Sequence, residues 1–138
     1  MRKAILMMLV TVVSGGAAAE WVKIGTTQTQ EHGYRFAYVD PSTIHKSGDM
    51  MRMLDMFDYE EAHHFFKPAG EAQRYLSQKG QSEYDCRSKR WRRLDFSLHS
   101  GNLAKGNVVY ASNGTPGPWL PASAGTVFEA RLIFACGI

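Results

Sequence analysis

Apolar and polar residues alternate along several short segments of the chain, a pattern typical of half-buried β-strands. Residues 20–25, 34–40 and 91–99 show this alternation. Three further segments are also expected to be strands: residues 50–59, which are apolar at both parities, residues 75–86, which mix polar and apolar positions, and residues 107–112. The alternation is strictest at residues 91–99, where Leu94, Phe96 and Leu98 share one face. The pattern predicts an antiparallel sheet of about six strands.

Turn-forming and polar residues separate these segments. The polar stretch at residues 26–33 is expected to join the first two strands, and Asp40-Pro41-Ser42 to end the second. Residues 60–73 are expected to form a long polar connection, because a Pro and a Gly interrupt them. Arg87-Ser88-Lys89 predicts a tight hairpin turn just past Cys86.

The strand at residues 50–59 is apolar on both faces. Met50, Leu54 and Met56 lie on one face, and Met51, Met53 and Phe57 on the other. A strand with this pattern needs cover on both sides. If a helix covers one face, a second subunit would cover the other, so we expect a homodimer.

The last segment of the chain predicts a helix. Ser123 or Thr126 can cap it, and Glu129 follows Thr126 at the spacing of a capping box. Three residues at intervals of four form an apolar stripe: Phe128, Leu132 and Cys136. Glu129 and Arg131 are expected to lie away from this stripe. The whole pattern indicates an α+β fold with a C-terminal helix packed on one face of the sheet.

The beginning of the chain has the features of a cleaved export signal. Arg2 and Lys3 precede an apolar run at residues 4–13, and a cluster of alanines at residues 17–19 marks the cleavage site. The run is too short for a transmembrane helix, and no cysteine follows the cleavage point directly to carry a lipid anchor. We expect one exported domain over residues 20–138, in the periplasm or at the cell surface.

Removal of the export signal changes the net charge, and export determines the expected oxidation state of the two cysteines. Without Arg2 and Lys3, fourteen basic residues face thirteen acidic ones, so the net charge falls from +3 to +1. In an oxidising compartment the two cysteines, Cys86 and Cys136, are expected to pair, the alternatives being a free pair or an intermolecular bridge. The bridge would close a loop of about 50 residues, worth about 4 kcal/mol in the chain-entropy model.

Several short motifs follow one another in a fixed order: WVKIG at residues 21–25, YVDPSTI at 38–44, DY at 58–59, Ser77, YDC at 84–86 with the arginine-bearing strand after it, Trp119, PAS at 121–123 and AC at 135–136. In this order and spacing the motifs resemble those of the surface-adhesin protein E family of bacterial exported proteins.

The resemblance implies a twisted antiparallel sheet of six strands, with a C-terminal helix tied to its concave face by the two cysteines, and dimerisation. It also implies adhesion to extracellular-matrix and plasma glycoproteins. No binding motif of the family can be matched to individual residues of this chain. The missing lipid-anchor cysteine leaves a soluble periplasmic structural or envelope-accessory protein, without a host ligand, as the alternative.

A basic cluster at the predicted hairpin is the candidate ligand-binding patch. It consists of Arg87, Lys89, Arg90, Trp91, Arg92 and Arg93. Such a cluster can bind sulfated polysaccharide or an acidic protein surface through charge-assisted hydrogen bonds. The alternative is a solvated hairpin balanced by Glu83, Asp85 and Asp95. Export and a near-neutral charge argue against nucleic acid.

Other chemistry finds little support in the sequence. The Met-rich strand and His63-His64 suggest Cu(I), but alternation separates the methionines onto two faces, so core packing is favoured and no metal or cofactor is expected. His32, His45 and His99 are far apart, and neither G-x-S-x-G nor H-E-x-x-H occurs. The sequence therefore predicts an exported, non-enzymatic binding protein.

Overall fold

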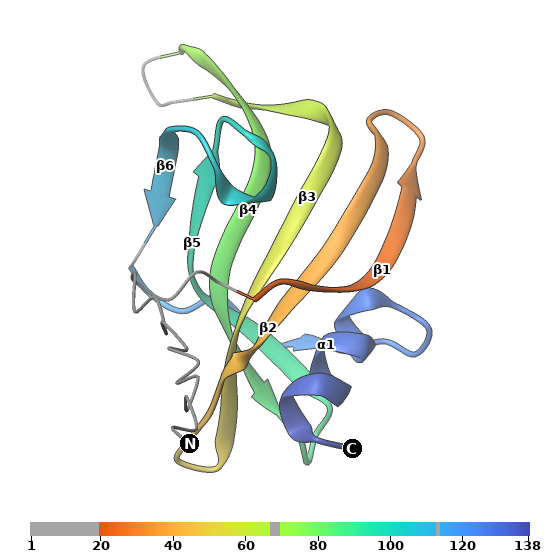
Figure 1. Cartoon of the computed structure of the whole chain (residues 1–138). Helices are drawn as coiled ribbons and strands as arrows, with labels where there is room; N and C mark the ends of the chain where they lie inside the picture. Colours follow the sequence, from red (N-terminus) through yellow and green to blue (C-terminus); the bar gives the residue numbers. More distant parts are fainter. Residues whose placement is uncertain (1–19, 67–69, 113) are drawn as a thin grey trace, which may run out of the picture.

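Six strands follow one another through a strongly twisted antiparallel sheet, in the order β1-β2-β3-β4-β5-β6, and one helix packs against it (Figure 1). The computed structural model describes residues 20–66, 70–112 and 114–138; the predicted export signal, residues 1–19, lies outside them. The elements are β1 Val22–Thr29, β2 Gly33–Ser47, β3 Met50–Phe66, β4 Ala72–Asp85, β5 Arg90–His99, the 3-10 turn η1 Asn102–Ala104, β6 Val108–Ser112, β7 Leu120–Pro121 and the helix α1 Val127–Cys136. The predicted sheet and C-terminal helix are confirmed; the two-residue β7, which pairs with β5, is an addition.

The predicted end of the second strand at Asp40-Pro41-Ser42 is wrong, because β2 continues to Ser47. A register shift between Asp40 and His45 accommodates the proline. Side chains replace the missing ladder bonds: Asp40 Oδ1 accepts from the Ser42 amide at 3.1 Å, and Thr43 Oγ1 accepts from the Leu54 amide at 2.9 Å. One polar contact within β2 and one from β3 therefore allow the strand to continue past Pro41.

Two predicted connections are also largely strand. Most of residues 60–73 continues the β3–β4 hairpin, in which the paired residues run from His63 with Tyr75 to Phe66 with Ala72. Residues 67–69 lie outside the described part of the chain. Stacking supports this pairing, since the His63 ring lies 3.9 Å from that of Tyr59 and 5.6 Å from that of Tyr75. Polar residues 26–29 extend β1, because threonine and glutamine are compatible with an exposed edge strand.

The ends of α1 are capped as the sequence predicts. Thr126 is the N-cap and its hydroxyl accepts from the Glu129 amide, while the Glu129 carboxylate accepts from the amide of Gly125, one residue before the cap. Gly137 ends the helix with φ of 67°, a left-handed conformation that glycine adopts without strain. These local contacts fix where the helix begins and ends.

Alternation along β3 places α1 and η1 on opposite sides of the sheet. The ring of Phe57 meets that of Phe128 in α1, edge to face, with centroids 6.1 Å apart. The next residue, Asp58, accepts from the Leu103 amide at 2.8 Å and from Asn102 Nδ2 at 3.1 Å. Successive side chains of a strand point to opposite faces, so we call the first side the helix face and the second the opposite face.

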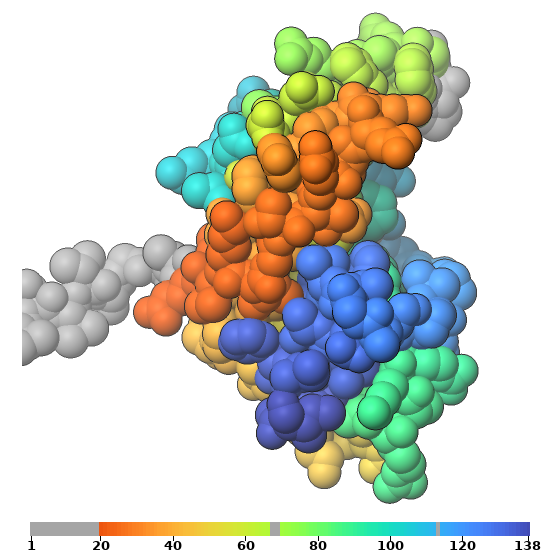
Figure 2. Space-filling view, turned by 90° about the vertical axis from the view of Figure 1, so that its right-hand side faces the viewer, coloured from red at the N-terminus to blue at the C-terminus, as the bar shows by residue number. Residues whose placement is uncertain are grey.

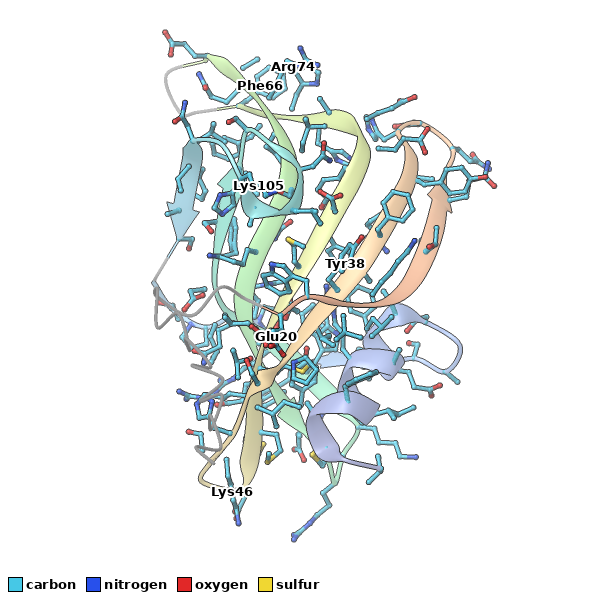
Figure 3. The ribbon with its side chains drawn as sticks, viewed as in Figure 1. Glu20, Tyr38, Lys46, Phe66, Arg74 and Lys105 are labelled. Atoms are coloured by element: carbon cyan, nitrogen blue, oxygen red, sulfur yellow. A yellow bond between two sulfur atoms is a disulfide. The ribbon has the colours of Figure 1, made fainter. Side chains whose placement is uncertain are left out.

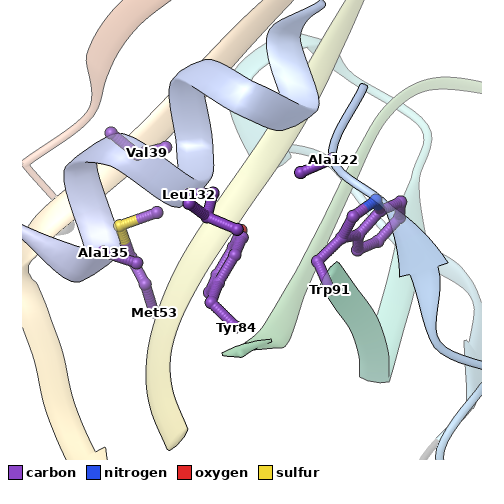
Figure 4. Packing of buried hydrophobic residues seen from close by; sticks show 7 residues of the cluster. All are labelled: Val39, Met53, Tyr84, Trp91, Ala122, Leu132 and Ala135. Atoms are coloured by element: carbon purple, nitrogen blue, oxygen red, sulfur yellow. The ribbon is translucent and has the colours of Figure 1, made fainter. Parts of the chain in front are cut away.

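The main core lies between α1 and the helix face (Figure 4). Its buried members are Val39, Met53, Tyr84, Trp91, Ala122, Leu132 and Ala135. Met56, on the opposite face, is also fully buried within the single chain. This methionine therefore needs no second subunit to cover it, and the homodimer stays a prediction.

The predicted disulfide is present. Cys86 and Cys136 are bonded, with Cα atoms 5.8 Å apart and a sequence separation of 50. The bond connects the end of the β4–β5 hairpin to the last residue of α1. The C-terminal end of the helix is thus covalently attached to the sheet.

Replacing both cysteines, Cys86→Ala with Cys136→Ala, should lower the free energy of unfolding by about 4 kcal/mol, because the unfolded chain regains the entropy of an open 50-residue loop. Urea unfolding followed by circular dichroism measures the difference. Parent protein treated with a reductant is the control and should lose a similar amount. A loss below about 1 kcal/mol would show that the bridge contributes little.

Candidate functional site

The β4–β5 hairpin end is held in place from several directions. Asp85 Oδ1 accepts from the amides of Arg87 and Ser88, each at 3.1 Å, and contacts with Ser88 hold the pKa of this carboxyl below its ordinary value. Lys89 has φ of 55°, and its carbonyl accepts from the Ala122 amide at 3.0 Å, next to β7. Together with the disulfide at Cys86, these contacts make the hairpin end a fixed platform.

Three residues of the predicted patch lie exposed on this platform: Arg87, Lys89 and Arg90. Among the described residues, none of the three has a carboxylate within ion-pair distance. Arg90 Nε donates a 3.2 Å hydrogen bond to Ser88 Oγ, a neutral partner. Their charges are therefore available to a ligand.

The structure adds Lys46 to this group. The β2–β3 hairpin ends beside the β4–β5 hairpin, and the two border a polar depression of about 320 Å³ lined by Lys46, Asp49, Met50, Asp85 and Arg87. Lys46 is exposed and lies at the end of the molecule remote from Arg74 and Lys105 (Figure 3). Reasoning along the chain missed it, because only the pairing of β3 with β4 reveals that the two hairpins end together.

Trp91 and Arg93, in contrast, point into the core. The Trp91 indole is buried and stacks on Phe128 of α1, with ring centroids 4.8 Å apart and planes 7° from parallel. Arg93 Nη1 bonds to Asp55 at 3.0 Å under the helix. The pairing of β4 with β5 shifts register between Gln81 and Ser82, and Ser82 is the cross-strand partner of Arg93. These two residues support the hairpin from inside and do not form its surface.

Arg92 lies on the opposite face, in a row of charges across three strands. Glu83 bonds to Arg92 Nη2 at 2.7 Å and to Arg52 Nε at 2.8 Å, and the Arg92 guanidinium also lies 4.6 Å from the ring centre of Trp119. Burial by itself raises the pKa of the Glu83 carboxyl, but the two arginines outweigh it and the net shift is downward. Arg92 is therefore largely engaged within the protein.

A buried charge network lies beneath α1. The fully buried carboxylate of Asp55 accepts from the hydroxyl of Ser82, from Arg93, and from Tyr84 at 3.5 Å. Arg131 of α1 also reaches it, with Nη2 3.5 Å from Oδ1. Burial, and the charge of Asp55, raise the pKa of Tyr84, so its hydroxyl stays protonated as a donor.

The prediction that Arg131 lies away from the packed side of the helix is wrong, because its side chain is fully buried. Its guanidinium lies 4.2 Å from the ring centre of Phe57 and 5.7 Å from that of Phe128. Arg35 of β2 lies at the same 4.2 Å from Phe57. None of the guanidinium nitrogens of Arg131 has a hydrogen-bond partner among the described residues. Stacking on aromatic rings and the Asp55 carboxylate at 3.5 Å compensate the buried cation instead.

The sequence matches the profile of a protein family described as surface-adhesin protein E over residues 21–137, nearly all of the described chain. The chain belongs to the surface-adhesin protein E family. None of the curated proteins matches it significantly.

Solved structures of Haemophilus influenzae protein E share the fold of this family member. Crystal form II matches with a TM-score of 0.55 and 9% identity over 73% of this chain and 80% of that one. The selenomethionine form matches with a TM-score of 0.55 and 10% identity over 84% of this chain and 88% of that one. Protein E from a non-typeable strain matches with a TM-score of 0.52 and 11% identity over 86% of each chain. At such low identity the likeness concerns the fold alone.

The three histidines considered for catalysis have separate partners in this adhesin E family member. His32 stacks on His63 with centroids 4.4 Å apart, His45 Nδ1 lies 2.9 Å from the carbonyl of Thr43, and His99 bonds to Ser97. Within residues 20–66, 70–112 and 114–138, no three His, Cys, Asp or Glu side chains gather as a metal site, and no helix there is long and apolar enough to cross a membrane.

Acid should destabilise the protein in part through Glu83. Because its folded pKa lies below the ordinary 4.5, its contribution is present above pH 4.5 and is lost as the pH falls through the folded value. Glu83→Gln should therefore flatten the fall in the free energy of unfolding below pH 4.5, at a cost of about 1–3 kcal/mol near neutral pH. Urea titrations at a series of pH values measure this. The matched control is the double variant Arg52→Gln with Arg92→Gln, which removes the two partners of Glu83. A Glu83→Gln profile parallel to that of the parent would contradict the assignment of the acid destabilisation to Glu83.

Proposed function

We propose that this protein is an exported, non-enzymatic adhesin that binds a polyanion, or a glycoprotein carrying one, through the end of the β4–β5 hairpin. The observation that carries the proposal is the exposure of Arg87, Lys89 and Arg90, without an ion-pair partner among the described residues, on a platform fixed by the disulfide. Membership of the surface-adhesin protein E family supports binding outside the cell as the class of activity.

The chemistry of the hairpin end suits sulfate or carboxylate groups. Arginine presents a planar fork of donors that pairs with two oxygens of one anionic group, and lysine adds a point charge. Lys46 extends the basic surface onto the neighbouring hairpin, next to Arg87. Asp49 and Asp85 lie between the two hairpins, so the cations outnumber the anions by two at this end. A sulfated polysaccharide is the ligand class that best matches this distribution.

Trp91, Arg92 and Arg93 have a supporting part in this proposal. Each is held by another group of the protein: Trp91 by Phe128, Arg92 by Glu83 and Arg93 by Asp55. Rigid support of this kind lowers the entropic cost of binding, because the hairpin is already ordered before the ligand arrives. Extracellular-matrix or plasma glycoproteins that present clustered acidic groups fall in the same ligand class.

Immobilised heparin tests the proposal. Replacing Arg87→Ser, Lys89→Asn and Arg90→Ser should lower the salt concentration that elutes the protein, and reduce the slope of log affinity against log salt by up to about 3, because fewer counterions are released. Asparagine is chosen at position 89 because it tolerates the positive φ.

A charge-matched variant controls for the loss of net charge. Lys23→Ser, Arg74→Ser and Lys105→Ser removes three exposed cations from other parts of the surface, two of them at the far end of the molecule (Figure 3). It should elute close to the parent. If both triple variants shift equally, binding follows net charge only and the hairpin is not the site.

A further inference from the structure

The longer free edge of the sheet lies beside a groove that is lined by a cation, Arg35, without an ion-pair partner among the described residues. β1 has a hydrogen-bonded neighbour on the β2 side only, within the part of the chain that the structure describes. Between β1 and the first turns of α1 runs a groove of about 530 Å³, on the surface seen in Figure 2 where β1 meets the helix. This volume lies in the range of ligand-binding sites.

The walls of the groove combine apolar surface with one half-buried cation. Ile24 of β1 and Val127, Phe128 and Ile133 of the α1 side provide the apolar part. Arg35 of β2 provides the cation, and its Nε is buried without a hydrogen-bond partner among the described residues. Most buried N–H donors in folded proteins have a hydrogen-bond partner, so an unpartnered one beside a groove can accept a ligand oxygen as its partner.

The lining carboxylate does not neutralise Arg35. Glu129 also borders the groove, but its carboxylate accepts from the Gly125 amide at the start of α1, and no ion pair with Arg35 forms in the described structure. Behind Arg35, the charges of Arg93 and Arg131 face the single carboxylate of Asp55. With Arg35, three guanidinium groups therefore share the one carboxylate of Asp55 beneath the helix, and Arg35 is the member of this set that borders the groove.

The features that usually prevent strand pairing lie at the start of β1, where the pairing with β2 shifts register between Lys23 and Gly25, and the edge beyond them is unprotected. From Ile24 to Thr29 it contains no charged residue and no proline. Its one charge, Lys23, lies over the Phe36 ring at 4.5 Å. The side chains next to the groove are small, namely Gly25, Thr26 and Thr27, so an added strand can approach closely.

We propose that β1 binds an extended peptide by strand addition, and that an acidic side chain of this peptide pairs with Arg35 in the groove. Thr27 is the cross-strand partner of Arg35. A peptide residue opposite Thr27 would lie about 10 Å from Arg35, two strand spacings away, a distance that an extended glutamate and an arginine span together. Apolar residues two positions to either side would contact the groove walls. This site is separate from the hairpin proposed to bind polyanions.

An NMR titration with a synthetic peptide tests the proposal. The probe is acetylated and amidated Thr-Val-Thr-Glu-Thr-Val-Thr, and its matched control has glutamine in place of the glutamate. The glutamate peptide should shift the amide signals of residues 24–28 and bind about tenfold more tightly than the control, the effect of one charge-assisted hydrogen bond.

Two kinds of variant separate the acidic contact from the strand pairing. Arg35→Gln should remove the difference between the two peptides, while Arg35→Lys should keep part of it. Thr26→Pro and Thr27→Pro are made separately, since alternate amides of an edge strand point outward and one of the two substitutions leaves the β1–β2 ladder intact. The folded one of the pair, identified by its melting temperature, should abolish binding of both peptides.

Three results would overturn the proposal. Equal affinity for the two peptides on the parent would remove the role of Arg35, and unshifted amides at residues 24–28 would remove β1 as the site. Concentration-dependent shifts of the same amides without peptide would show that a second copy of the chain occupies the edge. Arg35→Gln should elute from heparin at the same salt concentration as the parent, so a failure of the peptide proposal stays distinguishable from a failure of the hairpin proposal.

Discussion

The carboxylate of Asp55 is the charge around which the packing of the helix on the sheet is organised. It is fully buried, and four side chains from two strands and the helix reach it: Ser82, Tyr84, Arg93 and Arg131. A buried carboxylate without such partners would be strongly unfavourable, and a buried guanidinium equally so. The mutual compensation therefore requires that α1 lie in one position and one rotation on the sheet.

The position of the helix in turn determines the surfaces proposed to bind ligands. With Arg131 fixed over Phe57, the same helix places Phe128 against Trp91 and Cys136 beside the β4–β5 hairpin. The hairpin end is thereby attached to the core both by stacking and covalently. On its other flank the helix borders β1, forming the groove at Arg35. One buried ionic contact is thus linked to two separate exposed surfaces.

Period-two alternation was sufficient to predict the strands, and the capping box and apolar stripe to predict the helix, because these signals are local. The sequence could not show that β2 passes Pro41, since the compensating bond from Leu54 to Thr43 comes from another strand. Nor could it show the burial of Arg131, which depends on Asp55, far away in the chain.

The candidate site likewise has residues that the sequence could predict and residues that only the structure could reveal. Charge density along the chain identified Arg87, Lys89 and Arg90, which are exposed, but it could not separate them from neighbours that fold inward or pair across strands. That separation depends on strand alternation, a register shift beside Ser82 and the acidic partners on β3 and β4. Lys46 required the three-dimensional pairing of two hairpins.

A double-mutant cycle on Asp55 and Arg131 tests most directly whether this buried contact organises the fold. Asp55→Leu and Arg131→Met, alone and combined, are compared by urea unfolding. Asp55→Leu leaves the buried Arg131 cation without its carboxylate and should cost about 3–5 kcal/mol. Arg131→Met leaves Asp55 paired with Arg93 and should cost less. The double variant should lose at least about 2 kcal/mol less than the sum of the two single losses. Additive losses, within about 0.5 kcal/mol, would contradict the account.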